Sequence, residues 1–308
     1  MTRYIFRRVF MLIPLVIIVS IAIFLVAHVV PGDPIDAILQ PGAPPEMREE
    51  MRATYGLDRP LWIQYGIWVW RLLHADMGTA IVQSRSVTGL IAENLPYSLT
   101  LGVAALAFSA VMGVIFGMAA ATFRDTRLDH VSMTLSMIGA TVPTFFLGLI
   151  FMLAFAVWLR WFPVSGAGTL RSLVLPVLTV GIGGMALVAR VTRVAMVEAS
   201  QQDFVTLLHA KGMPVWRIQS RYILRIAMIP VITILGLRIG WILGGAVAAE
   251  YIFARPGLGT LLIRGLTQRD YPLIQGSLLM LSMAVLLGTF LADILQALVD
   301  PRVREAVR

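Results

Sequence analysis

The chain has 308 residues, of which 58% are hydrophobic and only 14% are charged, and its mean hydropathy is +0.83. These values exclude an ordinary soluble domain and indicate a polytopic membrane protein. The chain contains no cysteine, which excludes disulfides, thiolate metal sites and cysteine nucleophiles.

Six apolar runs are long enough to cross about 30 Å of hydrocarbon and predict an all-α fold with six transmembrane helices. They lie near residues 9–30, 97–122, 131–158, 173–197, 227–250 and 276–299. An even number of spans places both termini on one side of the membrane. The formal net charge of +8 falls entirely on that side, and positive charge favours the cytoplasm. We therefore expect cytoplasmic termini, and the basic charge does not predict a nucleic-acid partner.

The segment 31–96 follows the first span on the outer side and is too long for a simple turn. Leu61, Tyr65, Trp68 and Leu72 recur at helical spacing within it, which predicts an amphipathic helix at the outer boundary between lipid and water. We therefore divide the chain into 1–96, the first span with its external segment, and 97–308. The second part is a core of five spans with a polar loop at 198–226.

That loop separates the fourth and fifth spans, and its length predicts a function outside the bilayer. Ser200 and Asp203 have capping-box spacing and predict the start of a short helix. Apolar groups follow on one face, with a lysine one turn later: Phe204, Leu207, Leu208 and Lys211. Gly212 predicts a left-handed stop. A helix of roughly 11 residues is marginal alone in water, so we expect it to dock onto a partner. The alternative is a helix lying on lipid headgroups.

The fifth and sixth spans carry two unusual features. Gly236, Gly240 and Gly244 form one ridge of small residues along a helix, which predicts close helix packing. Arg238 and Asp293 are charged residues within apolar runs, where an unpaired charge costs about 2.5–3.5 kcal/mol on insertion scales. They predict either a structural ion pair or, for Arg238, a residue that lines a translocation path.

Familiar catalytic patterns are missing from the sequence. A P-loop needs a lysine in a specific glycine-rich context, and the sole lysine is Lys211, in Ala210-Lys211-Gly212. A relaxed dinucleotide pattern begins at Gly181, but it lies in an apolar span, where small-residue helix packing explains it better. The four histidines lack metal-ligand spacing. We expect a non-catalytic chain that binds no cofactor or metal of its own.

A series of short motifs runs almost end to end through the chain. The first half contains Pro31-Gly32-Asp33-Pro34, Gly56-Leu57-Asp58-Arg59-Pro60, Asp76-Met77-Gly78 and Pro163-Val164-Ser165-Gly166. The second half contains Glu198, Asp203-Phe204, Ala210-Lys211-Gly212, Pro230, Glu250-x-x-Phe253-x-x-Pro256-Gly257-Leu258-Gly259, Arg269-Asp270-Tyr271-Pro272 and Asp300-Pro301-Arg302. In this order and spacing they resemble the membrane-spanning permease subunit of binding-protein-dependent ABC importers for dipeptides and oligopeptides.

The resemblance implies that the loop is a coupling helix seated in a groove of a separate ATPase subunit. Phe204 with Leu207 or Leu208 would fill the groove, and Gly212 would permit the tight exit. Glu198 would brace the loop. The other loop residues that we assign to this site are Ser200, Asp203, Ala210 and Lys211. Thr206-Leu207-Leu208-His209 departs from the family's usual Thr-Ala-Arg run.

The resemblance also implies partners and a location. The partners would be a second, related permease subunit, two ABC ATPase subunits that bind ATP and Mg²⁺, and an external peptide-binding protein that delivers a short peptide. The location would be the bacterial cytoplasmic membrane, and the mechanism alternating access. Two alternatives stay open: the same architecture with a nickel chelate, a glycopeptide or another small solute as cargo, and a stand-alone secondary transporter.

Overall fold

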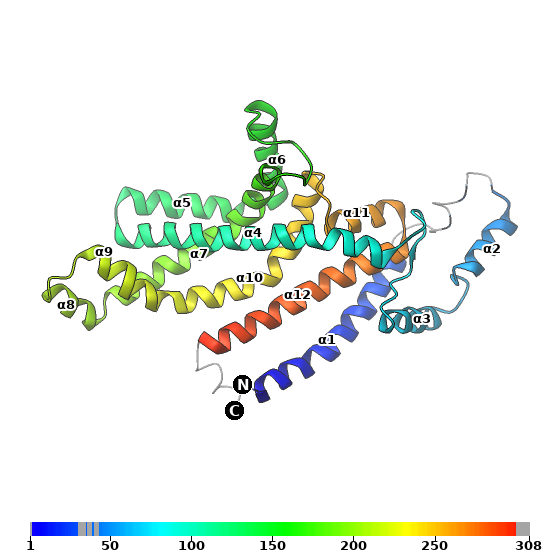
Figure 1. The fold of residues 1–308 in the computed structure, drawn as a ribbon, viewed down its shortest axis with the longest axis horizontal. Helices are drawn as coiled ribbons and strands as arrows, with labels where there is room; N and C mark the ends of the chain where they lie inside the picture. Colours follow the sequence, from blue (N-terminus) through cyan, green and yellow to red (C-terminus); the bar gives the residue numbers. More distant parts are fainter. Residues whose placement is uncertain (1, 30–34, 36–38, 40–42, 300–308) are drawn as a thin grey trace. The chain divides into compact units, whose positions relative to one another are not determined.

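The computed structural model describes residues 2–29, 35, 39 and 43–299, and helices dominate this part of the chain (Figure 1). The first helices are α1 (Thr2–Val29), α2 (Pro45–Thr54), α3 (Leu61–Leu73), α4 (Val87–Thr122), α5 (Arg127–Thr141) and α6 (Thr144–Phe151). A π-helix, η2 (Met152–Trp158), continues α6. Then follow α7 (Leu170–Ser200), α8 (Asp203–Ala210), α9 (Val215–Arg217), the π-helix η3 (Ile218–Ile223), α10 (Leu224–Ile252), α11 (Leu258–Gln268) and α12 (Tyr271–Val299). A short antiparallel hairpin precedes α4, and each of its strands, β1 (Thr79–Ala80) and β2 (Arg85–Ser86), has two residues. Two of the sequence motifs, 31–34 and 300–302, lie outside the described residues.

Most of the expected spans are single helices in the structure. Within the described residues, five helical segments are long and apolar enough to cross a membrane: Ile5–Val29, Val87–Thr122, Leu170–Ser200, Val215–Gly240 and Tyr271–Ile294. A sixth crossing exists if α5 and the α6–η2 helix together form one span. The all-α, polytopic fold class is therefore confirmed.

The third expected span, 131–158, is not one continuous helix, which corrects the sequence prediction. Arg127–Thr141 and Thr144–Trp158 meet at a bend of 106°. Val142 has extended backbone angles (φ −70°, ψ 128°) and precedes Pro143. Proline lacks the N–H that a helix interior needs and disfavours the helical conformation at the residue before it. The break therefore follows from a residue that was visible in the sequence.

The described structure divides into two compact units, and the division cuts across the sequence domains that we expected. One unit contains Met1–Arg8, Leu99–Arg255 and Val285–Arg308, and the other contains Val9–Ser98 and Pro256–Ala284. The boundary between Ser98 and Leu99 lies two residues from the expected boundary after residue 96. The second unit, however, also includes Pro256–Ala284 from the C-terminal part of the chain.

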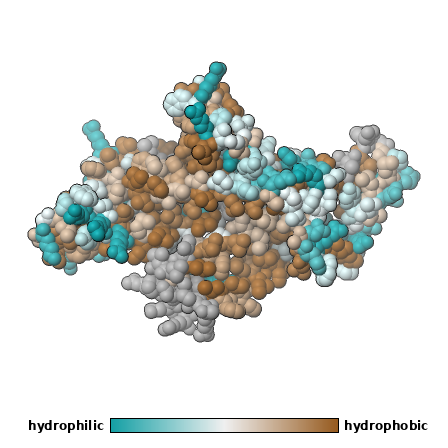
Figure 2. Space-filling model, viewed as in Figure 1, coloured by the Kyte–Doolittle hydropathy of each residue, from teal (hydrophilic) through white to brown (hydrophobic). Residues whose placement is uncertain are grey.

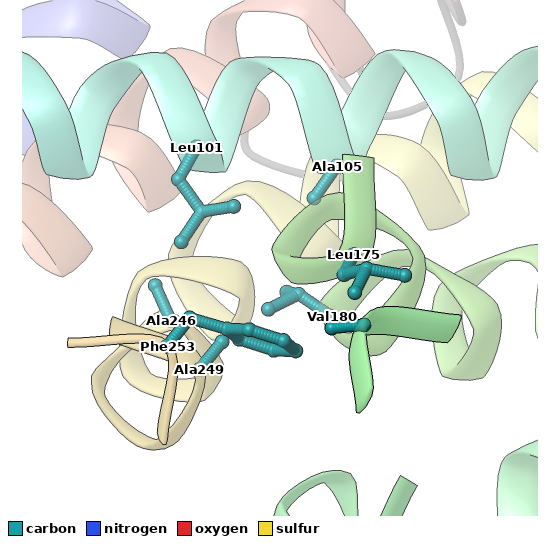
Figure 3. Packing of buried hydrophobic residues seen from close by; sticks show 8 residues of the cluster. Leu101, Ala105, Leu175, Val180, Ala246, Ala249 and Phe253 are labelled. Carbon is teal, nitrogen blue, oxygen red and sulfur yellow. The ribbon is translucent and has the colours of Figure 1, made fainter. Parts of the chain in front are cut away.

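The core of the first unit lies where α4, α7 and α10 approach one another. Figure 3 shows Leu101 of α4, Leu175 of α7 and Phe253, just after α10, pointing into one cluster. The helices approach closely because small residues line the contact: a Cβ at Gly181 would lie 2.6 Å from the Phe108 ring. The Ser109 hydroxyl also donates a 2.7 Å hydrogen bond to the Gly181 carbonyl. The glycine-rich stretch of α7 thus serves helix packing, as the sequence indicated.

The second unit is held together by hydrogen bonds between distant parts of the chain. The Asp270 carboxylate accepts from the Val82 backbone N–H through Oδ2 (2.9 Å) and from Leu273 N–H through Oδ1 (3.2 Å). It therefore caps the start of α12 and fixes the β1–β2 hairpin at once. The Ser98 hydroxyl accepts from Leu258 N–H (2.8 Å) at the start of α11.

The amphipathic helix expected in the segment 31–96 is α3. Its Trp68 is buried with Ile23 and Phe24 of α1, and Tyr65 and Leu72 pack against the same cluster. A hydrogen bond of 2.9 Å joins the Tyr65 hydroxyl to the hydroxyl of Ser20. The opposite face of α3 leaves large apolar side chains exposed. These are Trp62, Trp70 and Leu73. The position of α3 at the membrane boundary stays a prediction.

Candidate functional site

The polar loop at 198–226 begins differently from the prediction. α7 continues through Ser200, whose hydroxyl donates to the Val197 carbonyl (2.7 Å) inside that helix. α8 begins at Asp203 after Gln202, and no side chain caps its N-terminus. The Ser200–Asp203 capping box is therefore wrong, because the Ser200 hydroxyl is already used by the preceding helix. The short helix has 8 residues rather than about 11.

The end of α8 has the geometry that the glycine indicated. Gly212 has φ +74°, and its N–H donates to the His209 carbonyl (2.9 Å). The Met213 N–H reaches back to the Leu208 carbonyl (3.2 Å). These two bonds form a Schellman motif, which satisfies carbonyls at the helix end and needs a residue that tolerates positive φ. Lys211 precedes this turn as the C-cap residue.

Below α8 lies a small hydrophobic core that joins the loop to the spans. Val205 is buried with Met196 of α7, Ile218 and Ile223 of η3, and Ala227 of α10. Phe204 and Leu208 are partly buried against this cluster, and Met118 of α4 packs there too. The loop is thus packed onto the ends of three spans. A force on α8 is transmitted to them because packed interiors resist compression.

The outer surface of the loop carries different side chains from those expected to fill a groove. Leu207 is 55% exposed, whereas Phe204 and Leu208 face the core beneath. Trp216 of α9 is 67% exposed and lies under the Arg217 guanidinium, 5.5 Å from the ring centre. Figure 2 shows hydrophilic residues gathered over α8 and α9. A docking partner would therefore meet Leu207 and Trp216 within a polar surface.

Glu198, Asp203 and Ala210 are exposed, as are Leu207, Lys211 and Gly212. Glu198 lies in the last turn of α7 with an exposed side chain, and its carbonyl accepts from Gln201 N–H (3.2 Å). Asp203 and Ala210 are exposed at the two ends of α8. Asp203 favours the positive end of the helix dipole. The bracing role of Glu198 stays a prediction.

The two intramembrane charges have separate partners in the structure. Asp293 of α12 forms an ion pair with Arg8 of α1, with 3.1 Å between Oδ2 and Nη1. Arg238 of α10 donates a long hydrogen bond (3.5 Å) to the Gly183 carbonyl of α7. Asp293 is therefore paired with Arg8 instead of Arg238, which corrects the expectation of a structural pair between Arg238 and Asp293. The sequence could not separate these partners because Arg8 lies near the N-terminus, far from Asp293 along the chain.

The glycine ridge of α10 faces α12 at two of its three positions. A Cβ at Gly236 would lie 3.2 Å from Ala292 Cβ, and a Cβ at Gly240 would lie 2.9 Å from Thr289 Oγ1. At Gly244 a Cβ would meet nothing within 4 Å. There the helices leave a groove of about 600 Å³ between α6, α10 and α12. The groove is lined by Thr144, Phe145, Leu237, Gly240, Gly244, Gly245, Ala248, Val285 and Thr289.

A bidentate ion pair between α5 and α7 was not among the expected features. Arg193 donates to Asp129 through Nε and Nη2, each at 2.6 Å, and Asp129 Oδ2 also accepts from Asp125 N–H. The Asp129 side chain is almost completely buried. Arg193 lies two turns before the end of α7, and α8 follows that end. The ion pair therefore holds this end of α7 against α5. Sequence reasoning missed the pair because 64 residues separate the partners and no local pattern connects them.

Comparison with family models assigns both halves of the chain. Residues 113–305 match the "Binding-protein-dependent transport system inner membrane component" family, and residues 1–102 match the N-terminal family of the same transport systems. The first match covers more than half of the chain. The chain is an inner-membrane permease of the binding-protein-dependent transport family.

The permease has curated relatives along its whole length. A putative peptide transport system permease protein from Brucella abortus is 38% identical over 312 residues, which cover 99% of each chain. The glutathione transport system permease protein of Salmonella choleraesuis is 36% identical over 304 residues, again 99% of each. The fold is also similar to a solved chain of the MetNI methionine ABC transporter in an inward-facing conformation. That likeness has a TM-score of 0.56 at 16% identity and covers 68% of the permease and 96% of the solved chain.

Proposed function

We propose that this permease is the transmembrane subunit of an ATP-driven importer that moves dipeptides or short oligopeptides into the cell by alternating access. The names of its relatives, peptide and glutathione transport system permeases, support this class of cargo. A nickel chelate, a glycopeptide or another small solute is the second candidate cargo. The permease would bind no nucleotide itself, and ATP and Mg²⁺ would reside on two partner ATPase subunits.

One observation carries the proposal: α8 exposes Leu207, whereas its other large apolar residues pack onto α4, α7 and α10. An exposed apolar side chain on a helix that is packed onto the spans is better explained by contact with a partner than by exposure to water. We infer that α8 seats in a groove of an ATPase subunit. Closure of the ATPase pair around ATP would then move the ends of these three spans together.

The proposed orientation places this loop and both termini in the cytoplasm, in accordance with the excess of basic residues on that side. An external binding protein would deliver the peptide from the opposite side, and a second, related permease would complete the path. Arg238 is our candidate for a residue along that path. Its guanidinium would meet the carboxylate or carbonyls of a passing peptide.

The test compares two exposed leucines. Leu207→Asp places a charge on the docking face of α8, whereas Leu128→Asp places one on α5, where Leu128 is 47% exposed. Because both side chains are exposed, both variants should fold. We expect Leu207→Asp to reduce ATPase co-purification and ATP-dependent peptide uptake by about tenfold, and Leu128→Asp to retain both.

Equal retention of the ATPase by the two variants would remove α8 from the coupling mechanism. Uptake that proceeds without any ATPase subunit would favour a stand-alone transporter. Uptake of a nickel chelate but of no peptide by the wild-type complex would select the alternative cargo.

A further inference from the structure

The second unit of the permease contains a cavity of about 410 Å³, to which neither the loop at 198–226 nor Arg238 contributes. Its walls come from α1, from α2 and α3 with the residues between them, from the hairpin region, and from the start of α12. Sites for small solutes usually have volumes of roughly 300–1,000 Å³. The cavity is therefore large enough for one end of a short peptide.

The charges that line the cavity all have one sign. Arg59 and Arg71 line it, together with His28, and none of the described lining residues is an aspartate or glutamate. The nearby Asp76 contacts its own loop: its Oδ1 accepts a hydrogen bond from the Gly78 N–H (2.8 Å). A concave surface with two arginines and no carboxylate attracts an anion, and arginine suits a carboxylate especially well.

His28 also lines the cavity, and two contacts hold its ring in place. Its Nδ1 lies 2.8 Å from the Phe24 carbonyl, and its Nε2 lies 3.2 Å from Gln64 Oε1. The Gln64 amide is oriented by its own donation from Nε2 to the Arg59 carbonyl (2.7 Å). These contacts join α1 to α3 and to the residues before it, so they hold the walls of the cavity together.

One wall of the cavity is aromatic. Phe24 and Trp68 both line it, and their ring centres lie 6.0 Å apart. The indole Nε1–H of Trp68 is itself buried away from this surface. The wall therefore suits an apolar side chain of a ligand.

We propose that this cavity binds the C-terminal carboxylate and last side chain of a short peptide, as a second cargo site apart from the path between the spans. The carboxylate would lie between the two arginines, and the apolar side chain would lie against Phe24 and Trp68. That the anion is a peptide rests on the proposed function. The carboxylate chemistry rests on the cavity itself.

The test measures equilibrium binding of radiolabelled Ala-Phe to the purified permease complex in lipid nanodiscs, without the external binding protein. Ala-Phe amide is the competitor that lacks the charge. The variants are Arg71→Gln and Arg59→Gln, each of which removes a lining charge. Arg264→Gln is the matched control, because Arg264 is an exposed arginine of α11 in the same unit and does not line the cavity.

We expect Arg71→Gln and Arg59→Gln each to weaken Ala-Phe binding about tenfold, the usual effect of losing a hydrogen bond to a charged group. Arg264→Gln should bind normally, and the amide should compete about tenfold less well than the acid. Equal competition by acid and amide in the wild type would overturn the proposal, and this comparison needs no variant to fold.

Separate outcomes test the proposed function and the cavity. If the wild type imports peptides while Arg71→Gln and Arg59→Gln bind Ala-Phe like the control, the cavity proposal fails alone. If the wild type binds the free acid in the expected way but imports no peptide, the proposed function fails alone. Variants that keep Ala-Phe binding but lose stimulation by the external binding protein would also overturn the proposal, since the cavity would then receive an acidic side chain of that protein.

Discussion

Two glycines one turn apart on α10 allow a controlled measurement of helix packing. A Cβ at Gly240 would lie 2.9 Å from Thr289 Oγ1 and 3.3 Å from both the Cγ1 and the carbonyl oxygen of Val285 on α12. The Thr289 hydroxyl cannot easily move, because it donates to that same carbonyl (2.9 Å). At Gly244 a Cβ would meet nothing within 4 Å. The same substitution should therefore have opposite effects at the two positions.

The magnitudes follow from two opposing effects. Alanine gains up to about 1 kcal/mol over glycine in a helix interior, and both variants share this gain. Overpacking costs about 1–3 kcal/mol, and only Gly240→Ala incurs it. We therefore expect Gly244→Ala to be neutral or stabilising, and Gly240→Ala to be about 1–3 kcal/mol less stable than Gly244→Ala.

The assay is thermal unfolding of the purified permease complex in detergent, followed by tryptophan fluorescence and by loss of the monodisperse peak in gel filtration. Gly240→Leu should go further than Gly240→Ala and prevent assembly, because its larger side chain would collide with α12. Equal unfolding midpoints for the two alanine variants, or a higher midpoint for Gly240→Ala, would refute the inference that α10 and α12 meet at Gly240.

Three further predictions concern the loop and the charges. Gly212→Val should lower the free energy of unfolding by about 1–2 kcal/mol and reduce ATP-dependent uptake, because valine disfavours positive φ. Gly168→Val, at an open position with ordinary φ, is the control. Equal uptake by both variants would contradict this prediction. Asp129→Asn should destabilise the complex by about 1–3 kcal/mol, and a double-mutant cycle with Arg193→Gln that gives no coupling energy would exclude the ion pair as the cause. Arg238→Gln should leave a stable complex with coupled ATPase activity but reduced peptide uptake, and normal uptake would exclude Arg238 from the path.

The sequence predicted those features of the permease that depend on local chemistry. Apolar runs located the spans because the hydrocarbon sets both their length and their composition. Gly212 ended the short helix as expected, because few residues other than glycine adopt positive φ without strain. The glycines of α7, with Gly236 and Gly240 of α10, correctly indicated close helix contacts, because only small residues let two helix backbones approach. Gly244 was expected in the same ridge, but it makes no such contact.

The sequence did not predict features in which one side chain has several possible partners, or in which the partners lie far apart along the chain. Ser200 can cap a new helix or bond within the old one, and the sequence does not say which. Phe204 and Leu208 read as docking residues because periodicity shows that they share a face but not what covers that face. Asp129 and Asp293 have basic partners that only the folded chain brings near. The bend at Pro143, in contrast, could have been predicted from the proline.

The hydrogen bond between Asp270 and Val82 also has a consequence for biogenesis. The two residues lie 188 positions apart, and ribosomes add about 5–20 residues per second. The Val82 N–H therefore waits about 10–40 seconds for its acceptor to be synthesised. In the proposed orientation, the hairpin crosses the membrane before the carboxylate that later secures it is synthesised. We therefore expect proteases and quality-control factors on the outer side to meet the hairpin before its Asp270 contact forms.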